Sequence, residues 1–529
     1  MVAHIHTLAF QGIETRPVDV QVSLTKGLPT FSIVGLPDKA VAESRERIRS
    51  ALSALGLGLP PQRITINMAP ADLAKEGSHF DLPIACGILV AMDILSAEDL
   101  AHYIILGELG LDGSVAPVLG VLPAAFAACG RSLGLICPDQ QGGEAAWAGG
   151  SSIVAVPSLL ALINHFQGRS LLPAPTPKHL ERTLSHPDLA DVRGQESARR
   201  ALEVAAAGGH NLLMSGPPGS GKSMLARRLP GLLPPLSAQE ALEVSMIHSI
   251  AGLLKEGALM TQHPFRDPHH SASVAALIGG GIKARPGDIS LAHNGVLFLD
   301  ELAEFPRPAL EALRQPLETG QAVISRVHSH VSYPANVQLI AAMNPCRCGY
   351  LDNPALACSK APRCGEDYRG RLSGPLFDRI DIHIGVPAVI PADLARLSQG
   401  ESSATVAGRV MNARMRQEKR YQALGLPETR RINARADSTA LETAAALDSD
   451  GLKFLTQAAN TLHLSARGWN RILRVSRTLA DLDNAERVHR AHIAEALTWR
   501  PYSNTGRSLR SSGTTSPYPE KKQRPIPLA

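Results

Sequence analysis

The chain of 529 residues has few aromatic side chains and no hydrophobic run long enough to cross a membrane. Phe, Trp and Tyr make up 4% of its residues, which disfavours a surface that binds single strands by stacking many bases. The longest apolar stretch, residues 82–95, is interrupted by Asp93 and is shorter than the roughly 20 residues of a transmembrane helix. We therefore expect no membrane partner.

A secretion signal and a strong charge imbalance are also lacking. The first residues, Met1-Val-Ala-His-Ile-His, do not show the basic-then-apolar order of a signal peptide, so we expect a cytoplasmic protein. Its seven cysteines should then be reduced unless they bind metal. The net charge of +5 is small for this length, so any nucleic acid must be bound by a local basic surface.

A phosphate-binding loop is predicted at residues 216–223, which fit the pattern G-x-x-x-x-G-K-[ST]. An apolar run at 211–214 precedes it and a helical pattern at 224–229 follows, as such a loop requires. The alternative, a glycine-rich turn before a helix, explains less of this context. Lys222 should reach the β- and γ-phosphates of ATP, and the Ser223 hydroxyl should ligate Mg²⁺. The predicted nucleotide-binding residues here are Gly216, Pro217, Pro218, Gly219, Ser220, Gly221, Lys222 and Ser223.

Two carboxylates end a second apolar run, Gly295-Val-Leu-Phe-Leu-Asp-Glu301. A buried parallel strand has this pattern, and ligands gather at the carboxyl ends of such strands. We expect Asp300 to hold Mg²⁺ and Glu301 to polarise the attacking water. The alternative is a strand followed by an acidic helix cap, which a phosphate loop upstream makes less favoured.

Several motifs of the N-terminal region carry a family resemblance. They lie at residues 35–47 (GLPDKAVAESRER), 67–72 (NMAPAD), 75–83 (KEGSHFDLP) and 107–113 (GELGLDG). They resemble the N-terminal domain of the ComM/YifB family, which are magnesium-chelatase-like AAA+ ATPases. The resemblance implies an α/β protein: a domain similar to the proteolytic domain of Lon, with a ribosomal-S5-like fold, then a parallel-sheet ATPase domain and a helical lid.

The kinship with Lon raises the possibility of proteolysis by a Ser–Lys dyad. Laying 75–77 on the Lon serine motif puts His79 at the nucleophile position, with Ser78 one residue off. Laying 107–121 on the lysine motif puts Leu122 at the lysine position. Because a serine without a base is not an activated nucleophile, the sequence disfavours proteolysis.

Domain boundaries follow from composition and the resemblance. We expect a Lon-like domain at 1–172, a proline-rich linker at 173–187, an ATPase domain at 188–390, a helical lid at 391–502 and a disordered tail at 503–529. By the resemblance, Val192, Gly194 and Gln195 pack on the adenine of ATP.

The family's most specific motifs lie at 264–270 and 279–293. His269 and His270, as neighbours on a strand, should face opposite sides, which disfavours a metal pair. Glycines 279–281 suggest a mobile insertion carrying Lys283 and Arg285 toward phosphates. The resemblance places this insertion at the pore of a ring.

Strict alternation over 322–331 predicts a β-hairpin arm. Val323, Ser325, Val327, Ser329 and Val331 should form one face, and Ile324, Arg326, His328 and His330 the other. Pattern alone leaves a solvated edge strand as an equal alternative. In related AAA+ proteins a hairpin before the sensor strand enters the pore, so the resemblance favours DNA contact by Arg326, His328 and His330.

A further buried strand, 338–343, ends at Asn344, which resembles the first sensor of AAA+ proteins and could orient water beside Glu301. Four cysteines follow within 19 residues, at spacings of one, nine and five intervening residues. These spacings differ from two-residue knuckles, so a structural zinc site and free thiols both stay open. The four cysteines are Cys346, Cys348, Cys358 and Cys364.

The segment Leu372 to His383 resembles an arginine-finger segment, with Arg379 reaching the ATP of a neighbouring subunit. The alternative is a salt bridge of Arg379 with Asp378 or Asp381. Arg467, at the start of a long helix capped by Ser465, matches the second-sensor arginine. The basic pattern at 409–424 indicates either a solvated or a DNA-facing helix.

Together these features predict an ATP- and Mg²⁺-dependent motor. The resemblance implies a hexameric ring whose load is DNA, with helicase-driven branch migration in homologous recombination and natural transformation. Two alternatives stay open: a magnesium-chelatase-type or protein-remodelling ATPase, and an ATP-dependent protease.

Overall fold

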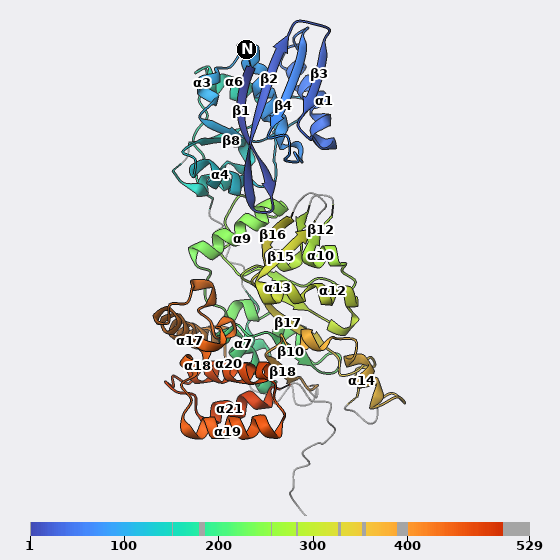
Figure 1. The fold of residues 1–529 in the computed structure, drawn as a ribbon, viewed down its shortest axis with the longest axis vertical. Coiled ribbons are helices and arrows are strands. Elements are labelled where there is room, and N and C mark those ends of the chain that lie inside the picture. The colour runs from blue at the N-terminus through green and yellow to red at the C-terminus, as the bar shows by residue number, and fades with distance from the viewer. Residues whose placement is uncertain are drawn as a thin grey trace, which may run out of the picture.

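The computed structural model describes residues 2–150, 152–178, 186–254, 256–281, 284–325, 330–351, 356–388 and 400–500. Three tiers follow one another along the long axis of the molecule (Figure 1). A mixed sheet with its helices forms one end, a parallel sheet with helices forms the middle, and the C-terminal helices form the other end. The fold is therefore α/β with a helical C-terminal region.

The first tier contains a seven-stranded sheet in the order β3-β4-β2-β1-β5-β8-β9. β1 and β2 form a long antiparallel hairpin that pairs Val2 with Ser23 and Gln11 with Glu14. Alternate residues of β1 are buried from Val2 to Thr7, as expected for a strand with one face on the core, and Leu8 and Ala9 are buried as well. Its main strands are β1 (Val2–Gln11), β2 (Glu14–Thr25), β3 (Thr30–Val34), β4 (Arg63–Ala69), β5 (Tyr103–Ile105), β8 (Gly134–Pro138) and β9 (Ile153–Val156).

Helices cover this sheet and complete its core. α2 is buried along nearly its whole length, because its sequence is apolar on every side. The helices of this tier are α1 (Lys39–Ala54), α2 (Asp81–Ala91), α3 (Ala97–Leu100), α4 (Val121–Cys129), α5 (Gly142–Ala145) and α6 (Leu159–Phe166), with a small ribbon of β6 (Glu108–Leu109) and β7 (Val115–Ala116).

The middle tier contains a five-stranded sheet in the order β11-β14-β17-β10-β18. All of its pairings are parallel. β14 and β17 are completely buried, which explains their continuous apolar sequences. The strands are β11 (Phe265–Arg266), β14 (Val296–Leu299), β17 (Gln338–Met343), β10 (Leu212–Ser215) and β18 (Ile382–Gly385).

One helix of the middle tier differs from the sequence prediction. The helical pattern predicted at 224–229 corresponds to α8, which begins at Lys222 and ends at Ala226, before Pro230. The helices of this tier are α7 (Glu196–Gly208), α8 (Lys222–Ala226), α9 (Ala238–Ala251), α10 (Val274–Ile278), α11 (Asp288–Leu291), α12 (Arg307–Ala312), α13 (Arg314–Thr319), α14 (Arg363–Arg369) and α15 (Gly374–Phe377). Two small ribbons join them, β12 (Gly279–Gly280) with β13 (Arg285–Pro286), and β15 (Gln321–Ser325) with β16 (His330–Pro334).

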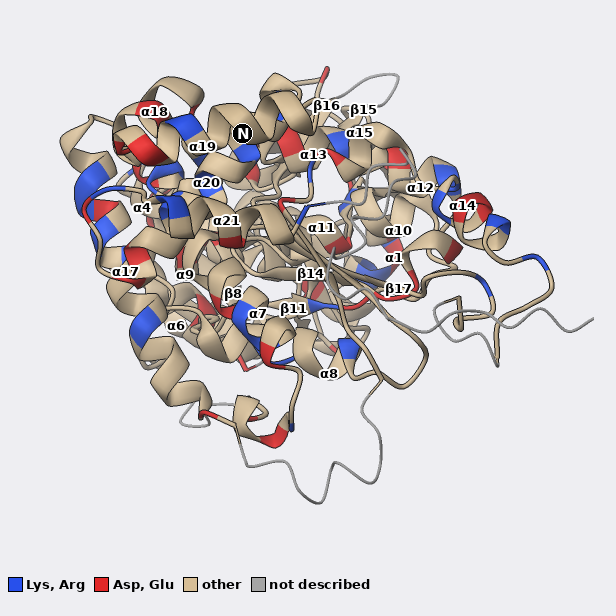
Figure 2. Ribbon diagram, turned by 90° about the horizontal axis from the view of Figure 1, so that it is seen from below, with Lys and Arg blue, Asp and Glu red and all other residues tan. Residues whose placement is uncertain are grey.

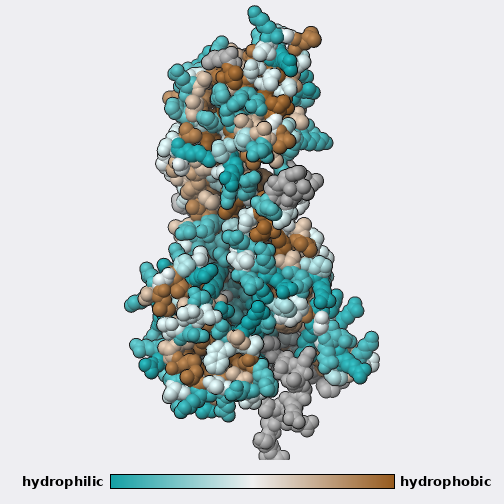
Figure 3. Space-filling model, in the orientation of Figure 1, coloured by the Kyte–Doolittle hydropathy of each residue, from teal (hydrophilic) through white to brown (hydrophobic). Residues whose placement is uncertain are grey.

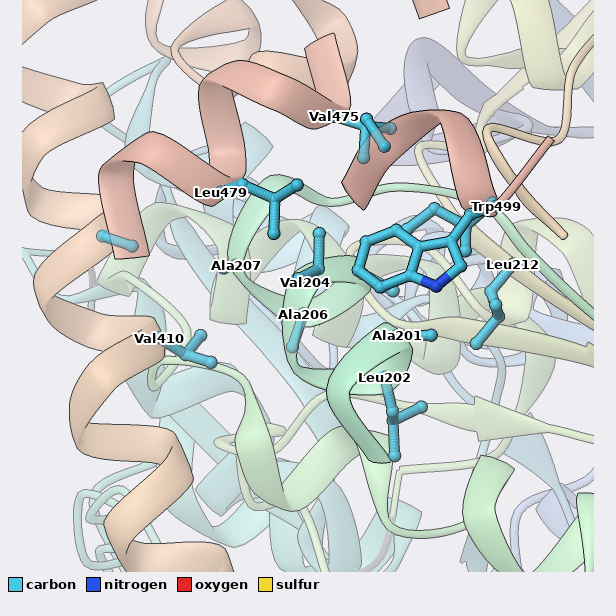
Figure 4. Close-up of a cluster of buried hydrophobic side chains, with 14 of the residues drawn as sticks. Ala201, Leu202, Val204, Ala206, Ala207, Leu212, Val410, Val475, Leu479 and Trp499 are labelled. Carbon is cyan, nitrogen blue, oxygen red and sulfur yellow. The ribbon is translucent and has the colours of Figure 1, made fainter. Parts of the chain in front are cut away.

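The C-terminal helices share one hydrophobic core with the parallel sheet. Trp499 lies beside Val475 of α20 and near Ala201 of α7 and Leu212 of β10 (Figure 4). Side chains of Ser402, Asp437, Asp448 and Ser465 cap the first four helices, as the short polar residues before each helix would predict. The helices are α17 (Ser403–Ala423), α18 (Ser438–Ala445), α19 (Ser449–Thr461), α20 (Ala466–Leu482) and α21 (Arg490–Thr498).

Two basic residues of α17, Arg409 and Arg414, bind partners within the chain, whereas Lys419 is exposed, so the choice between a solvated and a DNA-facing helix stays open. Arg414 donates to the Ala206 carbonyl oxygen at 2.7 and 3.0 Å, and burial lowers its pKa to about 9. Arg409 pairs with Glu203 at 2.5 Å. Figure 2 marks the Lys and Arg positions of this helix, which carries one acidic residue, Glu418.

The first and middle tiers are joined by hydrogen bonds and apolar contacts. The buried Glu144 carboxylate accepts from the Ser249 hydroxyl of α9 at 2.5 Å and from the Leu122 backbone N–H at 3.1 Å. Burial raises the pKa of Glu144, and these donors oppose that rise. On the face shown in Figure 3, hydrophobic residues are scattered among hydrophilic ones over all tiers. No helix in the described parts of the chain is long and apolar enough to cross a bilayer.

Candidate functional site

The candidate site lies where three neighbouring parallel strands end. β17 lies between β10 and β14. Its Ile340 pairs with Leu212 of β10, and its Gln338 pairs with Val296 of β14. The phosphate loop follows β10, Asn344 follows β17, and the carboxylate pair Asp300-Glu301 follows β14. Because parallel strands end at the same edge of a sheet, this topology brings the three predicted motifs together.

Glycine is required in the loop for two different reasons. Gly219 and Gly221 adopt φ angles of +74° and +88°, which disfavour residues with a side chain. A Cβ atom at either position would meet no atom within 4 Å, so these backbone units border open space. At Gly216 a Cβ would lie 2.0 Å from the Val386 carbonyl oxygen, so this glycine packs against the end of β18.

Lys222 lies over this loop and is only 8% exposed. Its Nζ atom donates to the carbonyl oxygens of Gly216 and Pro217 at 2.8 and 2.9 Å, and lies 3.4 Å from Oδ1 of Asn344. Burial lowers the pKa of Lys222, while the nearby Asp300 and Glu301 oppose that shift. The ammonium group is therefore held within the loop by neutral hydrogen-bond acceptors. The oxygens of an anionic phosphate would form stronger hydrogen bonds with it.

The residues that would bind Mg²⁺ also lie together. The Ser223 hydroxyl donates to Oδ2 of Asp300 at 2.6 Å, and Oδ1 of Asp300 accepts from the backbone N–H of Glu301 at 2.9 Å. A hydroxyl and a carboxylate are oxygen ligands of the kind that Mg²⁺ prefers. The open loop, the central ammonium and this oxygen pair fit ATP with Mg²⁺.

The segment predicted to pack on adenine lies beside the loop. Val192 is buried, and Gly194 and Gln195 have φ angles of +66° and +56°. Nε2 of Gln195 donates to the carbonyl oxygens of Ser220 and Pro387. Among the described residues, Oε1 of Gln195 is buried without a hydrogen-bond partner. Contact of these residues with adenine stays a prediction.

Family comparisons agree with this arrangement. Models of the magnesium chelatase subunit ChlI match residues 20–141 and 188–394, and a model of its C-terminal part matches residues 400–500. The chain is 43% identical over 504 residues to competence protein ComM of Haemophilus influenzae, covering 94% of this chain and 97% of the relative. It is 44% identical over 498 residues to the uncharacterized protein YifB of Escherichia coli, covering 94% and 96%. The chain belongs to the ComM/YifB family of magnesium-chelatase-like AAA+ ATPases.

The similarity to chelatase subunits themselves is more distant. The magnesium-chelatase 38 kDa subunit of Rhodobacter capsulatus is 27% identical over 335 residues, covering 58% of this chain and 84% of that subunit. As an AAA+ ATPase of the family, the chain is expected to use ATP and Mg²⁺, which the geometry around Lys222 and Ser223 accommodates.

The two predicted arginines of this AAA+ site have partners within the chain. Arg379 pairs with Glu318 and donates to the Pro375 carbonyl oxygen at 2.8 Å. Arg467 is 70% exposed, and its Nη1 atom lies 3.8 Å from Oδ2 of Asp378. The alternative, a salt bridge of Arg379 with Asp378 or Asp381, is wrong: Asp378 pairs with Arg471 and Arg467, and Asp381 pairs with His210.

The hairpin is confirmed, but its predicted faces are wrong. β15 pairs with β16 so that Ile324 lies opposite Val331 and Ser325 opposite His330. Ile324 and Val331 are both buried, together with Phe10 of the first tier. The prediction continued one alternation from β15 into β16, but the antiparallel pairing of the two strands decides which of their side chains share a face. His330 is exposed and contacts Ser325 at 3.1 Å, while Arg326 and His328 lie outside the described residues.

The insertion contains glycines that are needed for packing. Gly279 pairs with Pro286, and a Cβ on Gly279 would lie 2.6 Å from the Arg285 carbonyl oxygen. Arg285 is exposed, and Lys283 lies outside the described residues. Gly279 is therefore needed because the backbone of Arg285 approaches it closely, and not because the segment must be flexible.

His269 and His270 do not face opposite sides of a strand. β11 ends at Arg266, and the two rings lie in the following turn with their centroids 4.0 Å apart. The prediction from strand alternation is therefore wrong. Nδ1 of His270 lies 3.2 Å from Oε2 of Glu301, a contact that the sequence analysis missed. Its only sequence signal was the position of His270 in a family-specific motif.

The four cysteines of the loop after Asn344 lie close together as free thiols. The Sγ atoms of Cys346 and Cys348 are 3.0 Å apart, and this contact lowers the pKa of Cys348 to about 7. Burial raises the pKa of Cys364 to about 12, with Cys358 and Cys346 acting in the same direction. No three of these or other His, Cys, Asp or Glu side chains in the described chain are arranged to hold a metal ion. Zinc therefore stays a prediction.

The positions of a Lon-type dyad have other contacts here. Ser78 donates to the Glu108 carboxylate, and Nε2 of the buried His79 lies 2.9 Å from the Leu8 carbonyl oxygen. Leu122, at the lysine position, is fully buried where the first tier meets α9. The Ser78 hydroxyl thus donates its hydrogen bond to the Glu108 carboxylate, and not to the amine of a lysine as in a Ser–Lys dyad.

Proposed function

We propose that the chain is an ATP-driven DNA motor, acting as a branch-migration helicase in homologous recombination and natural transformation. The observation that carries the ATPase part is the convergence of Lys222, Ser223, Asp300, Glu301 and Asn344 at one edge of the parallel sheet. DNA as the load is supported by the relative named competence protein ComM, which is similar over 94% of this chain.

The proposed division of labour follows the chemistry of each group. ATP supplies the phosphoryl group and Mg²⁺ neutralises its charge. Lys222, the loop and its oxygen pair hold phosphate and metal, while Glu301 accepts a proton from the attacking water and Asn344 orients that water. Val192, Gly194 and Gln195 hold the adenine, and Arg467 lets the helical region respond to the bound nucleotide.

The proposed assembly is a homo-hexameric ring in the cytoplasm. Arg379 would leave Glu318 and reach the ATP bound by a neighbouring subunit. DNA would pass through the pore against Lys283 and Arg285 of the insertion and Arg326, His328 and His330 of the hairpin. We retain the proposed units 1–172, 188–390 and 391–502, joined by a linker at 173–187 and followed by a disordered tail at 503–529.

The cysteine cluster is a proposed structural zinc site, with free thiols as the alternative. Its supporting observation is the proximity of Cys346, Cys348, Cys358 and Cys364. Metal analysis of the purified chain, free of affinity tags, decides between them. A content of about one zinc ion per chain supports the site. A zinc content near zero that is the same in the wild type and in a Cys358→Ser variant contradicts it.

A chelatase-type or protein-remodelling motor is the second candidate. It is favoured by the similarity to the Rhodobacter capsulatus chelatase subunit, which covers 58% of this chain, and by the match of residues 188–394 to the magnesium chelatase family model. An ATP-dependent protease is the third, and the contacts of Ser78 and Leu122 weigh against it.

The deciding experiment compares wild type with Glu301→Gln on a four-way DNA junction. ATP-dependent migration by the wild type and none by the variant supports the proposal, since Gln keeps the shape of Glu but cannot accept the proton. ATP hydrolysis without migration, and without stimulation by any DNA, would move the chelatase-type or protein-remodelling function ahead. Degradation of casein by the wild type, lost in Ser78→Ala, would favour the protease.

A further inference from the structure

One side chain outside the predicted set contacts the proposed catalytic base. Nδ1 of His270 lies 3.2 Å from Oε2 of Glu301, and both side chains are about half-buried. Glu301 directly follows the Mg²⁺-binding candidate Asp300, whereas His270 lies 31 positions before Glu301 in the chain. The contact therefore arises from the fold and not from local sequence.

The sheet brings these two residues to the same edge. β11 and β14 pair in parallel, with Arg266 opposite Leu297, so the turn after β11 and the carboxylates after β14 emerge side by side. Asp267 at the start of this turn pairs with Arg227 at the end of α8, with an N–O distance of 3.1 Å. Arg266 pairs with Asp288 at 2.6 Å. The turn is thus tied to the helix that follows the phosphate loop and to α11.

Within the turn, the two histidines have different partners. Nδ1 of His269 lies 2.7 Å from the Ser271 hydroxyl, and the His269 carbonyl oxygen accepts from the Ala272 N–H at 2.9 Å. His269 therefore holds the turn together. The ring of His270 instead reaches Glu301.

We propose that His270 is the positioning residue for Glu301 in ATP hydrolysis, an inference that rests on the proposed function. An N–H at Nδ1 of His270 donates to Oε2 of Glu301, which fixes the plane of the carboxylate. The other oxygen, Oε1, is then left to accept the proton of the attacking water. Glutamate has three rotatable side-chain bonds, and Glu301 is 51% exposed, so without a partner its carboxylate would spend less time in one orientation.

The test is a set of three variants in steady-state ATPase assays. His270→Ala removes the donor, His270→Asn restores an N–H near the position of Nδ1, and His269→Ala is the matched control on the neighbouring residue. We expect His270→Ala to lower kcat about tenfold, less than the roughly 10²–10⁴-fold contribution of a general base itself. KM and the binding of a fluorescent ADP analogue should stay within about twofold, since positioning acts on the chemical step.

His270→Asn should recover most of the lost kcat, and His269→Ala, which removes a contact within the turn but keeps the donor to Glu301, should lower kcat less than His270→Ala does. The inference is overturned if His270→Ala has wild-type or increased kcat, if His270→Asn is as slow as His270→Ala, or if KM rises in place of a fall in kcat. Failure of the proposed function looks different: Glu301→Gln would then hydrolyse ATP as fast as the wild type, or the wild type would not hydrolyse ATP.

Discussion

His383, one residue inside β18, shows how burial sets the protonation of a single side chain. Its Nε2 atom lies 3.2 Å from the Ile380 carbonyl oxygen, and its ring stacks on Phe377. Burial first, and then the charge of Arg471, lower the pKa of His383 to about 4. The folded chain therefore favours the neutral ring, and an unfolded chain, with a histidine pKa of about 6.5, takes up a proton more readily.

This difference predicts a loss of stability in mild acid. Because the folded-state pKa is depressed, the full stability is present above about pH 6.5 and declines as the pH falls toward 4. His383→Gln keeps an N–H near Nε2 but does not titrate. From pH 7.5 to pH 5 we expect the wild type to lose about 1–2 kcal/mol more unfolding free energy than this variant.

Denaturant unfolding at the two pH values measures the effect. The difference between the two proteins isolates His383 from the other histidines, which both chains share. Equal pH dependence in wild type and His383→Gln would contradict the prediction.

At the scale of elements, α20 is held to α17 by a buried charge cluster around Asp481. Its carboxylate pairs with Arg477, also on α20, at 2.9 Å and with Arg420 of α17. It also accepts from Nδ2 of Asn433 at 2.9 Å. Asp481 and Arg477 are both completely buried, so each neutralises the other where water cannot.

Removing this charge should destabilise the helical region strongly. Asp481→Asn leaves Arg477 buried without its ion pair, at an expected cost of about 3–5 kcal/mol in unfolding free energy. Asp483→Asn, two residues along and about half-exposed, is the matched control and should cost less than about 1 kcal/mol. Guanidinium unfolding followed by Trp fluorescence reports on this region through Trp469 and Trp499. Similar costs for the two variants would show that the cluster is not a principal source of stability.

Elements whose signal is local were predicted well. The buried strand at 338–343 and the serine cap of the helix at 466–482 both depend on neighbours in sequence. The phosphate loop and its carboxylates were predicted because parallel strands deliver consecutive motifs to one edge.

Predictions that needed distant partners failed or were missed. The basic side chains of α17 contact Glu203, Ala206 and Asp481, each of which is more than 60 positions from its partner in the sequence. The faces of the hairpin depend on the register in which β15 pairs with β16, and burial of Ile324 depends on Phe10 of another tier. The contact of His270 with Glu301 requires the pairing of β11 with β14, which no local pattern encodes.

At the scale of the whole molecule, the first tier is fixed to the middle tier by contacts that include Leu122, a residue at a Lon dyad position. Leu122 stands at the lysine position, and its backbone N–H binds Glu144, which also binds Ser249 of α9. Phe10 packs in the cluster with Ile324 and Val331 of the hairpin. Movement of the hairpin would therefore also act on the first tier.

The proposed ring makes each ATP site depend on two subunits, which predicts complementation between two inactive variants. Lys222→Ala destroys the phosphate site of its own subunit but keeps Arg379, whereas Arg379→Ala keeps the phosphate site but lacks the finger. Each variant alone should hydrolyse ATP at background rates. In an equal mixture, a site is complete when an Arg379→Ala subunit meets the arginine of a Lys222→Ala neighbour. Random assembly makes about a quarter of the sites complete, and activity should recover to about that fraction of wild type.

The control mixes Lys222→Ala with a double variant that carries both changes, a mixture in which no site has an intact phosphate loop. Exchange of subunits between rings is followed by energy transfer between two fluorophores, so that mixing is established independently of activity. If subunits exchange and activity stays at background, Arg379 acts within its own chain, for example through its ion pair with Glu318. Recovery in the first mixture and none in the second would place Arg379 at the site of the neighbouring subunit, because no single chain in either mixture combines both groups.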